Sequence, residues 1–159
     1  MIRVGQGYDI HRFADGRPLW LGGCEIRGVT QGLLGHSDAD ALVHAVIDAL
    51  LGALALGDIG QWFPDTDERW RGASGALLLG TVLADPRVSG WHVVNLDSTV
   101  ITQRPKLSPH IGAIRASLAA LLGVDETCVS VKAKTKEGLD AVGAGDALEA
   151  QAVILLERR

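Results

Sequence analysis

The alternation of residue types near the N-terminus is the feature that most constrains the fold. The even positions of residues 2–13 hold Ile2, Val4, Tyr8 and Ile10, and the odd positions hold Gly5, Gly7, Asp9, His11 and Phe13. Because successive strand residues point to opposite faces, this stretch predicts a strand with two unlike faces. We expect the even face to pack in the core and the odd face to carry polar groups beside two glycines.

Asp9 and His11 leave the same strand face, and on their own they often form only a solvated or hydrogen-bonded pair. A helix predicted from "GHSDADALVHAVIDALLGALALGD" adds His44, with Ser37 or Asp38 as its N-cap and Gly57 as its stop signal. Two histidines and a carboxylate suit Zn²⁺ with a fourth position open to substrate. Asp48, one turn after His44, is either a partner that orients the ring or an exposed polar residue.

The remaining patterns predict an α+β fold with helices on one face of a mixed sheet. A hairpin is expected from "LWLGG" to "CEIRG", a loop over 58–72 and a helix over about 74–85. Strands follow at "WHVVNLDSTVI", "CVSVKAKT" and "LEAQAVILL", and a helix begins just after Ser108 with Pro109 in its first turn. We interpret "AVGAGDA" as a turn.

Composition excludes several classes of protein. The 159 residues fit one domain, 1–159, and the net charge of −4 argues against a general nucleic-acid binder. Cys24 and Cys128 lack metal-ligand spacing and are expected to be small buried residues rather than a disulfide. We see no signal peptide and no run long enough to cross a bilayer, so a cytoplasmic location without membrane partners is expected.

Two helix starts suggest binding of anions. His36 and Ser37 precede the first helix, and Lys106 precedes a later one. Simple capping and a solvated lysine are the alternatives. In "VKAKTKEG" the lysines share one strand face, most simply exposed to solvent, and the opposite face offers Thr135 and Glu137 to a phosphate or Mg²⁺.

The motifs "GYDIHRF", "GHSDADALVHAVIDALLGALALGDIG", "FPDTD", "RPKLSPHI" and "VKAKTKEGL" together resemble the 2-C-methyl-D-erythritol 2,4-cyclodiphosphate synthase family over essentially the whole chain. The resemblance implies a ferredoxin-like subunit in a homotrimer with active sites at subunit boundaries. It implies a phosphorus–oxygen lyase of the non-mevalonate isoprenoid pathway, which releases CMP as it cyclises its substrate, and a location in the cytoplasm or, after loss of a transit peptide, the plastid stroma.

The resemblance also assigns roles to residues of this chain. It implies zinc ligands at Asp9, His11 and His44, a second metal (Mg²⁺ or Mn²⁺) at Glu137, and catalytic support from His36 and Thr135. Positions implied to bind the diphosphate and the methylerythritol phosphate are Ser37, Asp58, Ile59, Gly60, Phe63, Pro64, Asp65, Thr66 and Asp67. Positions implied to form the cytidine pocket are Thr102, Gln103, Arg104, Pro105, Lys106, Leu107, Ser108, Ala133 and Lys134.

The chain departs from the common family pattern near the expected threefold axis. Ala141 and Ala144 stand where many members carry Phe and Arg, and Lys134 replaces a frequent hydroxyl residue. The change at Ala144 puts in doubt an anion or prenyl-phosphate site in the central channel. Two other functions remain open: a zinc-dependent phosphohydrolase, and a non-catalytic trimer that binds nucleotide or metal.

Overall fold

The computed structural model describes residues 1–158, so the last residue of the predicted 1–159 domain lies outside the described part. Its strands are β1 (Ile2–Asp15), β2 (Trp20–Leu21), β3 (Cys24–Glu25), β4 (Gln31–Leu33), β5 (His92–Ile101), β6 (Val129–Lys134) and β7 (Ala147–Glu157). Its helices are α1 (Ala41–Ala53), α2 (Ile59–Trp62), α3 (Gly75–Ala84), α4 (Ile111–Leu122) and α5 (Asp140–Ala144), with 3-10 turns η1 (Glu68–Trp70) and η2 (Glu126–Cys128).

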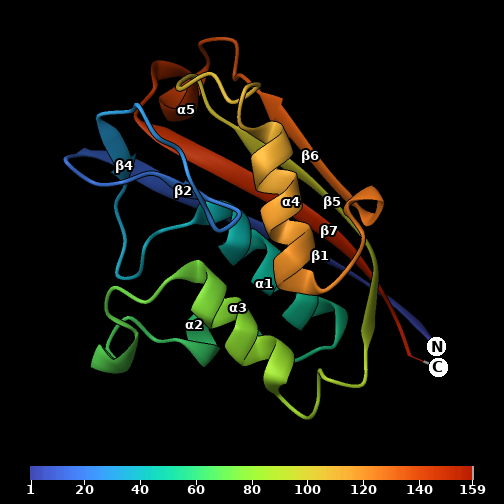
Figure 1. The fold of residues 1–159 in the computed structure, drawn as a ribbon. Coiled ribbons are helices and arrows are strands. Elements are labelled where there is room, and N and C mark those ends of the chain that lie inside the picture. Colours follow the sequence, from blue (N-terminus) through green and yellow to red (C-terminus); the bar gives the residue numbers. More distant parts are fainter. Residues whose placement is uncertain (159) are drawn as a thin grey trace.

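Five strands form one mixed sheet in the order β4-β1-β7-β5-β6. Strand β7 runs antiparallel to both β1 and β5, whereas β5 and β6 are parallel, as Figure 1 shows. Strands β1 and β5 are therefore parallel with β7 between them, as in the split units of a ferredoxin-like sheet. The β5–α4–β6 unit differs, because its two parallel strands are direct neighbours.

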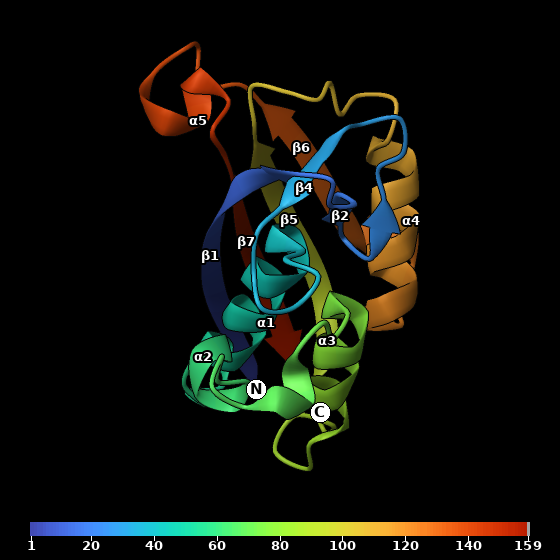
Figure 2. The same ribbon diagram turned by 90° about the vertical axis from the view of Figure 1, so that its left-hand side faces the viewer.

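Helices α1, α3 and α4 lie on one side of the sheet (Figures 1 and 2). Helix α1 packs on β1 and β7, α4 packs on β6, and α3 packs on α1. The short helix α5 lies at the end of the sheet, away from the two chain termini (Figure 2). The predicted α+β sheet and the β2–β3 hairpin are thus confirmed.

The expected orientation of β1 is wrong. The even side chains are the exposed ones: Val4 is 66% exposed and Ile10 44%. The buried face is the one with the glycines, because α1 packs there with its backbone almost touching the strand. A Cβ on Gly5 would lie 1.9 Å from the carbonyl oxygen of Ala49. The absence of side chains at Gly5 and Gly7 therefore allows the helix to pack closely on the strand.

The start of α1 also differs from the expectation. Its N-cap is Asp40 rather than Ser37 or Asp38, and the Asp40 carboxylate accepts a hydrogen bond from Val43 N at 3.0 Å. The same carboxylate accepts hydrogen bonds from the backbone of hairpin turn 22–23 at 2.9 and 2.6 Å. Burial raises its pKa, although these N–H groups oppose the rise. Asp40 thus joins the hairpin to the helix.

Two other helix ends fall elsewhere than predicted. Helix α1 ends at Ala53 with Leu54 as its C-cap, before Gly57. Helix α4 begins at Ile111 with His110 as its N-cap, so Pro109 precedes the helix instead of lying in its first turn. Helix α3 lies within one residue of the predicted limits, and Ser74 Oγ caps it by accepting a hydrogen bond from Leu77 N at 3.2 Å.

The glycine-rich segment interpreted as a turn contains the short helix α5. The helix ends at Gly145, which has a φ of +86°. A left-handed residue at this position is a common way to end a helix, and glycine adopts it without steric cost. Gly145 of "AVGAGDA" therefore ends a short helix.

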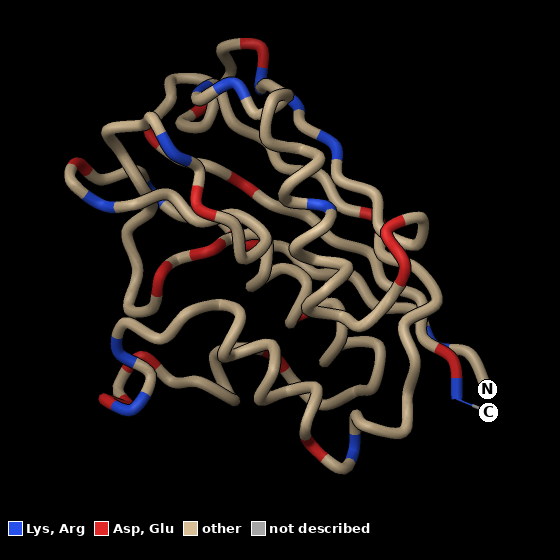
Figure 3. Tube along the Cα trace, in the orientation of Figure 1, with Lys and Arg blue, Asp and Glu red and all other residues tan. Residues whose placement is uncertain are grey.

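The lysines of "VKAKTKEG" do not share one solvated face. Lys132 pairs with Asp97 at 2.6 Å on the strand, whereas Lys136 lies beyond the end of β6 and contacts Glu149. Figure 3 shows that basic and acidic positions are interspersed along the whole chain. Both cysteines are free thiols, but each is only partly buried rather than buried as expected. No helix of the described residues is long and apolar enough to cross a membrane.

The close approach of α1 to β1 predicts that Gly7→Ala will strongly destabilise the protein. Its Cβ would lie 1.9 Å from Ala45 O and 2.7 Å from Ala49 N, both backbone atoms that cannot rotate away. We expect the free energy of unfolding in urea to fall by about 3 kcal/mol.

Gly80→Ala is the matched control, because Gly80 is exposed in α3 with no atom within 4 Å of an added Cβ. Alanine is the better helix former, so a gain of about 0.5–1 kcal/mol is expected. Equal stability of the two variants at one protein concentration would contradict this account of the packing.

Candidate functional site

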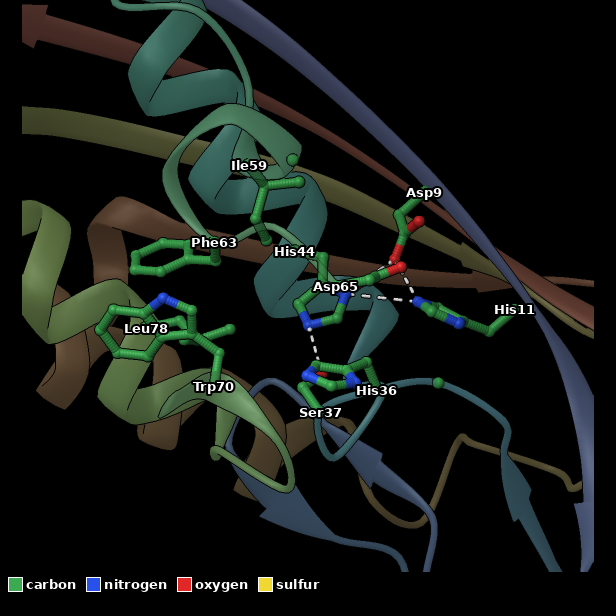
Figure 4. A pocket seen from close by; sticks show the side chains of 12 residues that line it. Asp9, His11, His36, Ser37, His44, Ile59, Phe63, Asp65, Trp70 and Leu78 are labelled. Atoms are coloured by element: carbon green, nitrogen blue, oxygen red, sulfur yellow. Dashed lines mark hydrogen bonds and ion pairs between the residues drawn. The ribbon is translucent and has the colours of Figure 1, made fainter. Parts of the chain in front are cut away.

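Three side chains from β1 and α1 converge on one point. Asp9 Oδ2 lies 2.8 Å from His11 Nε2 and 3.0 Å from His44 Nδ1, and the two ring nitrogens are 3.3 Å apart. Figure 4 shows the carboxylate and both rings pointing toward one another. The close packing of α1 on β1 places His44 opposite the strand residues, so the sequence-predicted triad is brought together in the structure.

The far nitrogen of each ring has its own partner. His11 Nδ1 lies 2.8 Å from the carbonyl oxygen of Leu34, and His44 Nε2 lies 3.2 Å from Ser37 Oγ. A carbonyl can only accept, so Nδ1 of His11 carries a proton and its Nε2 faces Asp9. Such contacts to the outer ring nitrogen typically orient a metal-ligating histidine.

The three inner atoms fit a metal ion. When both rings are neutral and His44 donates from Nε2 to Ser37, lone pairs of Asp9, His11 and His44 face one another, and a cation between them would relieve the repulsion. A tetrahedral ion with bonds of about 2.0–2.1 Å needs ligand atoms about 3.3 Å apart, close to the separations of 2.8–3.3 Å found here. The donor set leaves a fourth position open, as in catalytic zinc sites.

The electrostatics of Asp9 favour its charged form. Burial alone would raise its pKa, but hydrogen bonds from His11 and His44 outweigh burial and lower the pKa to about 2. The same contact with Asp9 raises the pKa of His11, although burial opposes it. The carboxylate is therefore ionised at neutral pH, and a metal ion would bind in competition with a proton on the imidazole of His11.

Asp48 has a role that differs from both sequence alternatives. Its Oδ1 accepts a hydrogen bond from Ile59 N at 2.7 Å, and it is only partly exposed. Burial raises the pKa of Asp48. The residue therefore fixes the start of α2, whose Ile59 lines the same cavity as the metal triad. No hydrogen bond or ion pair among the described residues joins Asp48 to His44.

A cavity of about 250 Å³ opens beside the triad. It is lined by Asp9, His11, Gly35, His36, Ser37, His44, Ile59, Gly60, Phe63, Asp65, Trp70 and Leu78. Figure 4 shows a polar side with the triad and an apolar side with Phe63, Trp70 and Leu78. Phe63 and Trp70 meet edge to face with centroids 4.8 Å apart, so the wall away from the metal triad is a packed aromatic surface.

Sequence reasoning missed Gly35, Trp70 and Leu78 in this cavity. Trp70 lies in η1, within a loop that carried no periodic pattern, and its only signal was its position shortly after "FPDTD". Leu78 matches the buried face of α3, where an apolar residue is expected whether or not it lines a cavity.

Several residues predicted for the same subsite lie outside the cavity lining. Asp58 caps α2 through a hydrogen bond from Gln61 N at 2.9 Å. Asp67 pairs with Arg69 at 2.6 Å, and its carbonyl oxygen lies 3.4 Å from His36 Nε2. The residues of the predicted group that the structure does not place on the cavity wall are Asp58, Pro64, Thr66 and Asp67.

A second cavity of about 420 Å³ lies between the loop after β5 and the end of β6. It is lined by Thr102, Gln103, Pro105, Lys106, Leu107, Ser108, Ala133, Lys134 and Thr135. Of the predicted cytidine residues, Arg104 alone is absent from this lining. Arg104 faces Gly145 instead, with its guanidinium 3.0 Å from where a Cβ on that glycine would lie.

The predicted second-metal residue lies next to this cavity. Thr135 Oγ donates a hydrogen bond to Glu137 Oε1 at 2.8 Å. Glu137 is exposed, and its outer carboxylate oxygen has no hydrogen bond or ion pair among those of the described residues. A carboxylate of this kind suits Mg²⁺ that also binds ligand phosphates.

The chain matches known proteins over nearly its whole length. The YgbB family profile matches residues 2–157. A 2-C-methyl-D-erythritol 2,4-cyclodiphosphate synthase from Chromobacterium violaceum is 58% identical over 156 residues, 98% of each chain.

Solved structures agree in fold. The bifunctional IspDF from Campylobacter jejuni matches with a TM-score of 0.93 and 38% identity over 100% of this chain, which corresponds to 43% of that longer protein. A CDP-bound form of 2C-methyl-D-erythritol-2,4-cyclodiphosphate synthase matches with a TM-score of 0.88 and 41% identity, covering 98% of this chain and 100% of that one. The chain belongs to the YgbB family, the enzyme family of the 2-C-methyl-D-erythritol 2,4-cyclodiphosphate synthases.

Proposed function

We propose that the protein converts 4-diphosphocytidyl-2-C-methyl-D-erythritol 2-phosphate into 2-C-methyl-D-erythritol 2,4-cyclodiphosphate and CMP. An oxygen of the 2-phosphate attacks the β-phosphorus, and the bond from that phosphorus to the CMP oxygen breaks. The reaction is intramolecular, so no nucleophile from the chain is needed. The converging triad of Asp9, His11 and His44 in a chain of this family is the observation that carries the proposal.

Asp9, His11 and His44 would hold Zn²⁺, and Glu137 would hold Mg²⁺ or Mn²⁺ together with the substrate phosphates. Bound there, the two ions would neutralise phosphate oxygens and withdraw charge from the reacting phosphorus. Asp9 supports the first role because it is ionised, and the hydrogen bond from Thr135 supports the second because it fixes one oxygen of Glu137.

The remaining polar groups of the site would position the diphosphate. His36 and Ser37 both line the triad cavity. Ser37 is itself fixed, since its Oγ accepts a hydrogen bond from Ala39 N at 3.1 Å. Donors that are already fixed stabilise developing charge without reorganising. Thr135 has one hydroxyl hydrogen, donated to Glu137 in the structure, and it would turn that hydrogen to the phosphoryl group in transfer when substrate binds.

The second cavity would bind the cytidine end of the substrate. Leu107 is buried beneath it, and Ala133 leaves space for a flat base. Lys106 and Lys134 line it and would contact the phosphates. The CDP-bound relative supports a substrate linked to cytidine diphosphate, because CDP carries the same group.

We further propose that the chain acts as a homotrimer with active sites at the boundaries between subunits. The helix-free face of the sheet exposes apolar side chains from neighbouring strands, including Val4, Tyr8 and Ile10 on β1 and Val153 on β7. Contiguous exposed apolar surface of this kind is characteristic of interfaces. The triad cavity and the cytidine cavity share no lining residue, which fits a site completed by two subunits.

Removal of a zinc ligand tests the reaction. We expect His44→Ala to lose bound zinc and to lower turnover by at least about a hundredfold, since even indirect partners of metal ligands contribute about 10–100-fold. Zinc content would be measured by mass spectrometry and turnover by phosphorus NMR, where two coupled resonances report the cyclic diphosphate. His92→Ala, at an exposed position that starts β5, is the control and should keep both.

Two results would refute the cyclisation. Full turnover and zinc content in His44→Ala would contradict the metal assignment. CMP with a linear phosphate product from the unaltered protein would show that water is the nucleophile and would favour the phosphohydrolase.

Disruption of the open sheet face tests assembly. Val153 is 44% exposed at the centre of that face, so Val153→Lys would place a charge in the proposed interface and should convert the trimer into monomers with little turnover. Leu77→Lys, on the exposed side of α3, is the control with a 55% exposed apolar residue away from this face. Light scattering after gel filtration gives the mass, and a monomeric parent protein would contradict the trimer.

A further inference from the structure

The residues that follow β6 form a tight turn with an unusual backbone. Leu139 N donates a hydrogen bond to Lys136 O at 2.9 Å, which closes a four-residue turn. The two central residues, Glu137 and Gly138, have φ of +52° and +78°. Positive φ at both positions defines a type I′ turn, and a residue other than Gly, Asn or Asp is uncommon there. The chain thus holds Glu137 in a costly conformation, which requires support from its surroundings.

Lys136 supplies that support from the residue just before the strained one. Its Nζ donates hydrogen bonds to both carboxylate oxygens of Glu149, at 3.0 and 3.1 Å. Glu149 is only 7% exposed and lies on β7, where it pairs with Ile10 of β1 and Ile101 of β5. The central strand of the sheet therefore anchors the start of the turn.

The same ammonium group also reaches the far end of the turn. Its Nζ lies 3.3 Å from Asp140 Oδ2, while Asp140 Oδ1 accepts a hydrogen bond from Val142 N at 2.9 Å at the start of α5. Asp140 itself has a φ of +56°. The Lys136 side chain thus joins the sheet, the turn and the helix. Figure 3 shows basic positions beside acidic ones at this end of the molecule.

We propose that Lys136 is a positioning residue that holds Thr135 and Glu137 in the geometry required to bind a divalent cation together with a cytidine diphosphate group. This inference rests on the proposed function, since that function makes Glu137 the ligand of the second metal. The Lys136 ammonium is occupied by the carboxylates of Glu149 and Asp140, so it would not serve as a phosphate contact. Its effect reaches the metal through the backbone of the turn.

Lys132, four residues earlier on β6, offers a natural comparison. It pairs with Asp97 at 2.6 Å, but both side chains are 46% exposed. Exposed ion pairs contribute little, whereas removal of one partner from a buried pair leaves an uncompensated charge. Substituting Lys132 removes a lysine charge near the site, whereas substituting Lys136 also removes the link between the turn and Glu149. Comparing the two variants therefore distinguishes these effects.

The test measures metal affinity directly. We expect Lys136→Met to raise the dissociation constant of Mn²⁺ by about tenfold, as for other indirect partners of metal ligands. Mn²⁺ binding would be measured by electron paramagnetic resonance in the presence of CDP. Zinc content should not change. Amide hydrogen exchange in residues 137–140 should accelerate. Lys136→Arg should restore most of the affinity, because its guanidinium keeps the charge and the donors.

Lys132→Met is the matched control and should bind Mn²⁺ as the parent protein does. The double variant Lys136→Met, Glu149→Gln leaves no buried unpaired carboxylate at position 149, so it should fold and show the same loss of affinity as Lys136→Met. Unchanged Mn²⁺ affinity in a folded Lys136→Met or double variant would overturn the role of Lys136. If the parent protein fails to bind Mn²⁺ with CDP, the second metal site itself is refuted. In that case amide exchange still tests the positioning role, which unchanged exchange in Lys136→Met would overturn.

Discussion

The packing of α1 on β1 is the contact on which the rest of the structure depends. Gly5 and Gly7 let the helix backbone approach so closely that a Cβ at either position would lie 1.9 Å from a helix carbonyl oxygen. Asp9 and His11 continue the same strand face, and one face of α1 presents His44 to them. The spacing of the metal triad is therefore a consequence of the distance between helix and strand, and the glycines belong to the site as much as its ligands do.

A second set of contacts fixes the loop that completes this site. The buried Asp40 carboxylate joins the hairpin turn to the start of α1 and so defines where residues 35–39 can run. Within that loop Ser37 Oγ lies 3.2 Å from His44 Nε2, and the Leu34 carbonyl just before it orients His11. These contacts explain how the two histidine rings of the triad, which are far apart in the sequence, are held in fixed orientations.

The sequence predicted most elements and the triad, because both depend on periodic or short-range patterns. Asp9 and His11 at i and i+2 had to share a strand face, whichever face was buried. The burial of β1 was predicted wrongly for a physical reason. Apolar residues on the even face suggested a core, but the packing of a helix on glycine is not visible in a hydropathy pattern. The cap at Asp40 was missed because two of its partners come from a distant hairpin. Trp70 was missed because its loop has no periodic pattern of apolar residues.

The distribution of lysines links the fold to the proposed chemistry. A chain with a net charge of −4 gains no general attraction for a polyanionic substrate, so its cations must be placed locally. Lys132 and Lys136 are paired with carboxylates outside the cytidine cavity. Lys106 and Lys134 line that cavity and make no ion pair among the described residues. The paired lysines are thus neutralised within the scaffold, and the unpaired ones lie on the wall of the cavity that we propose for the cytidine diphosphate group.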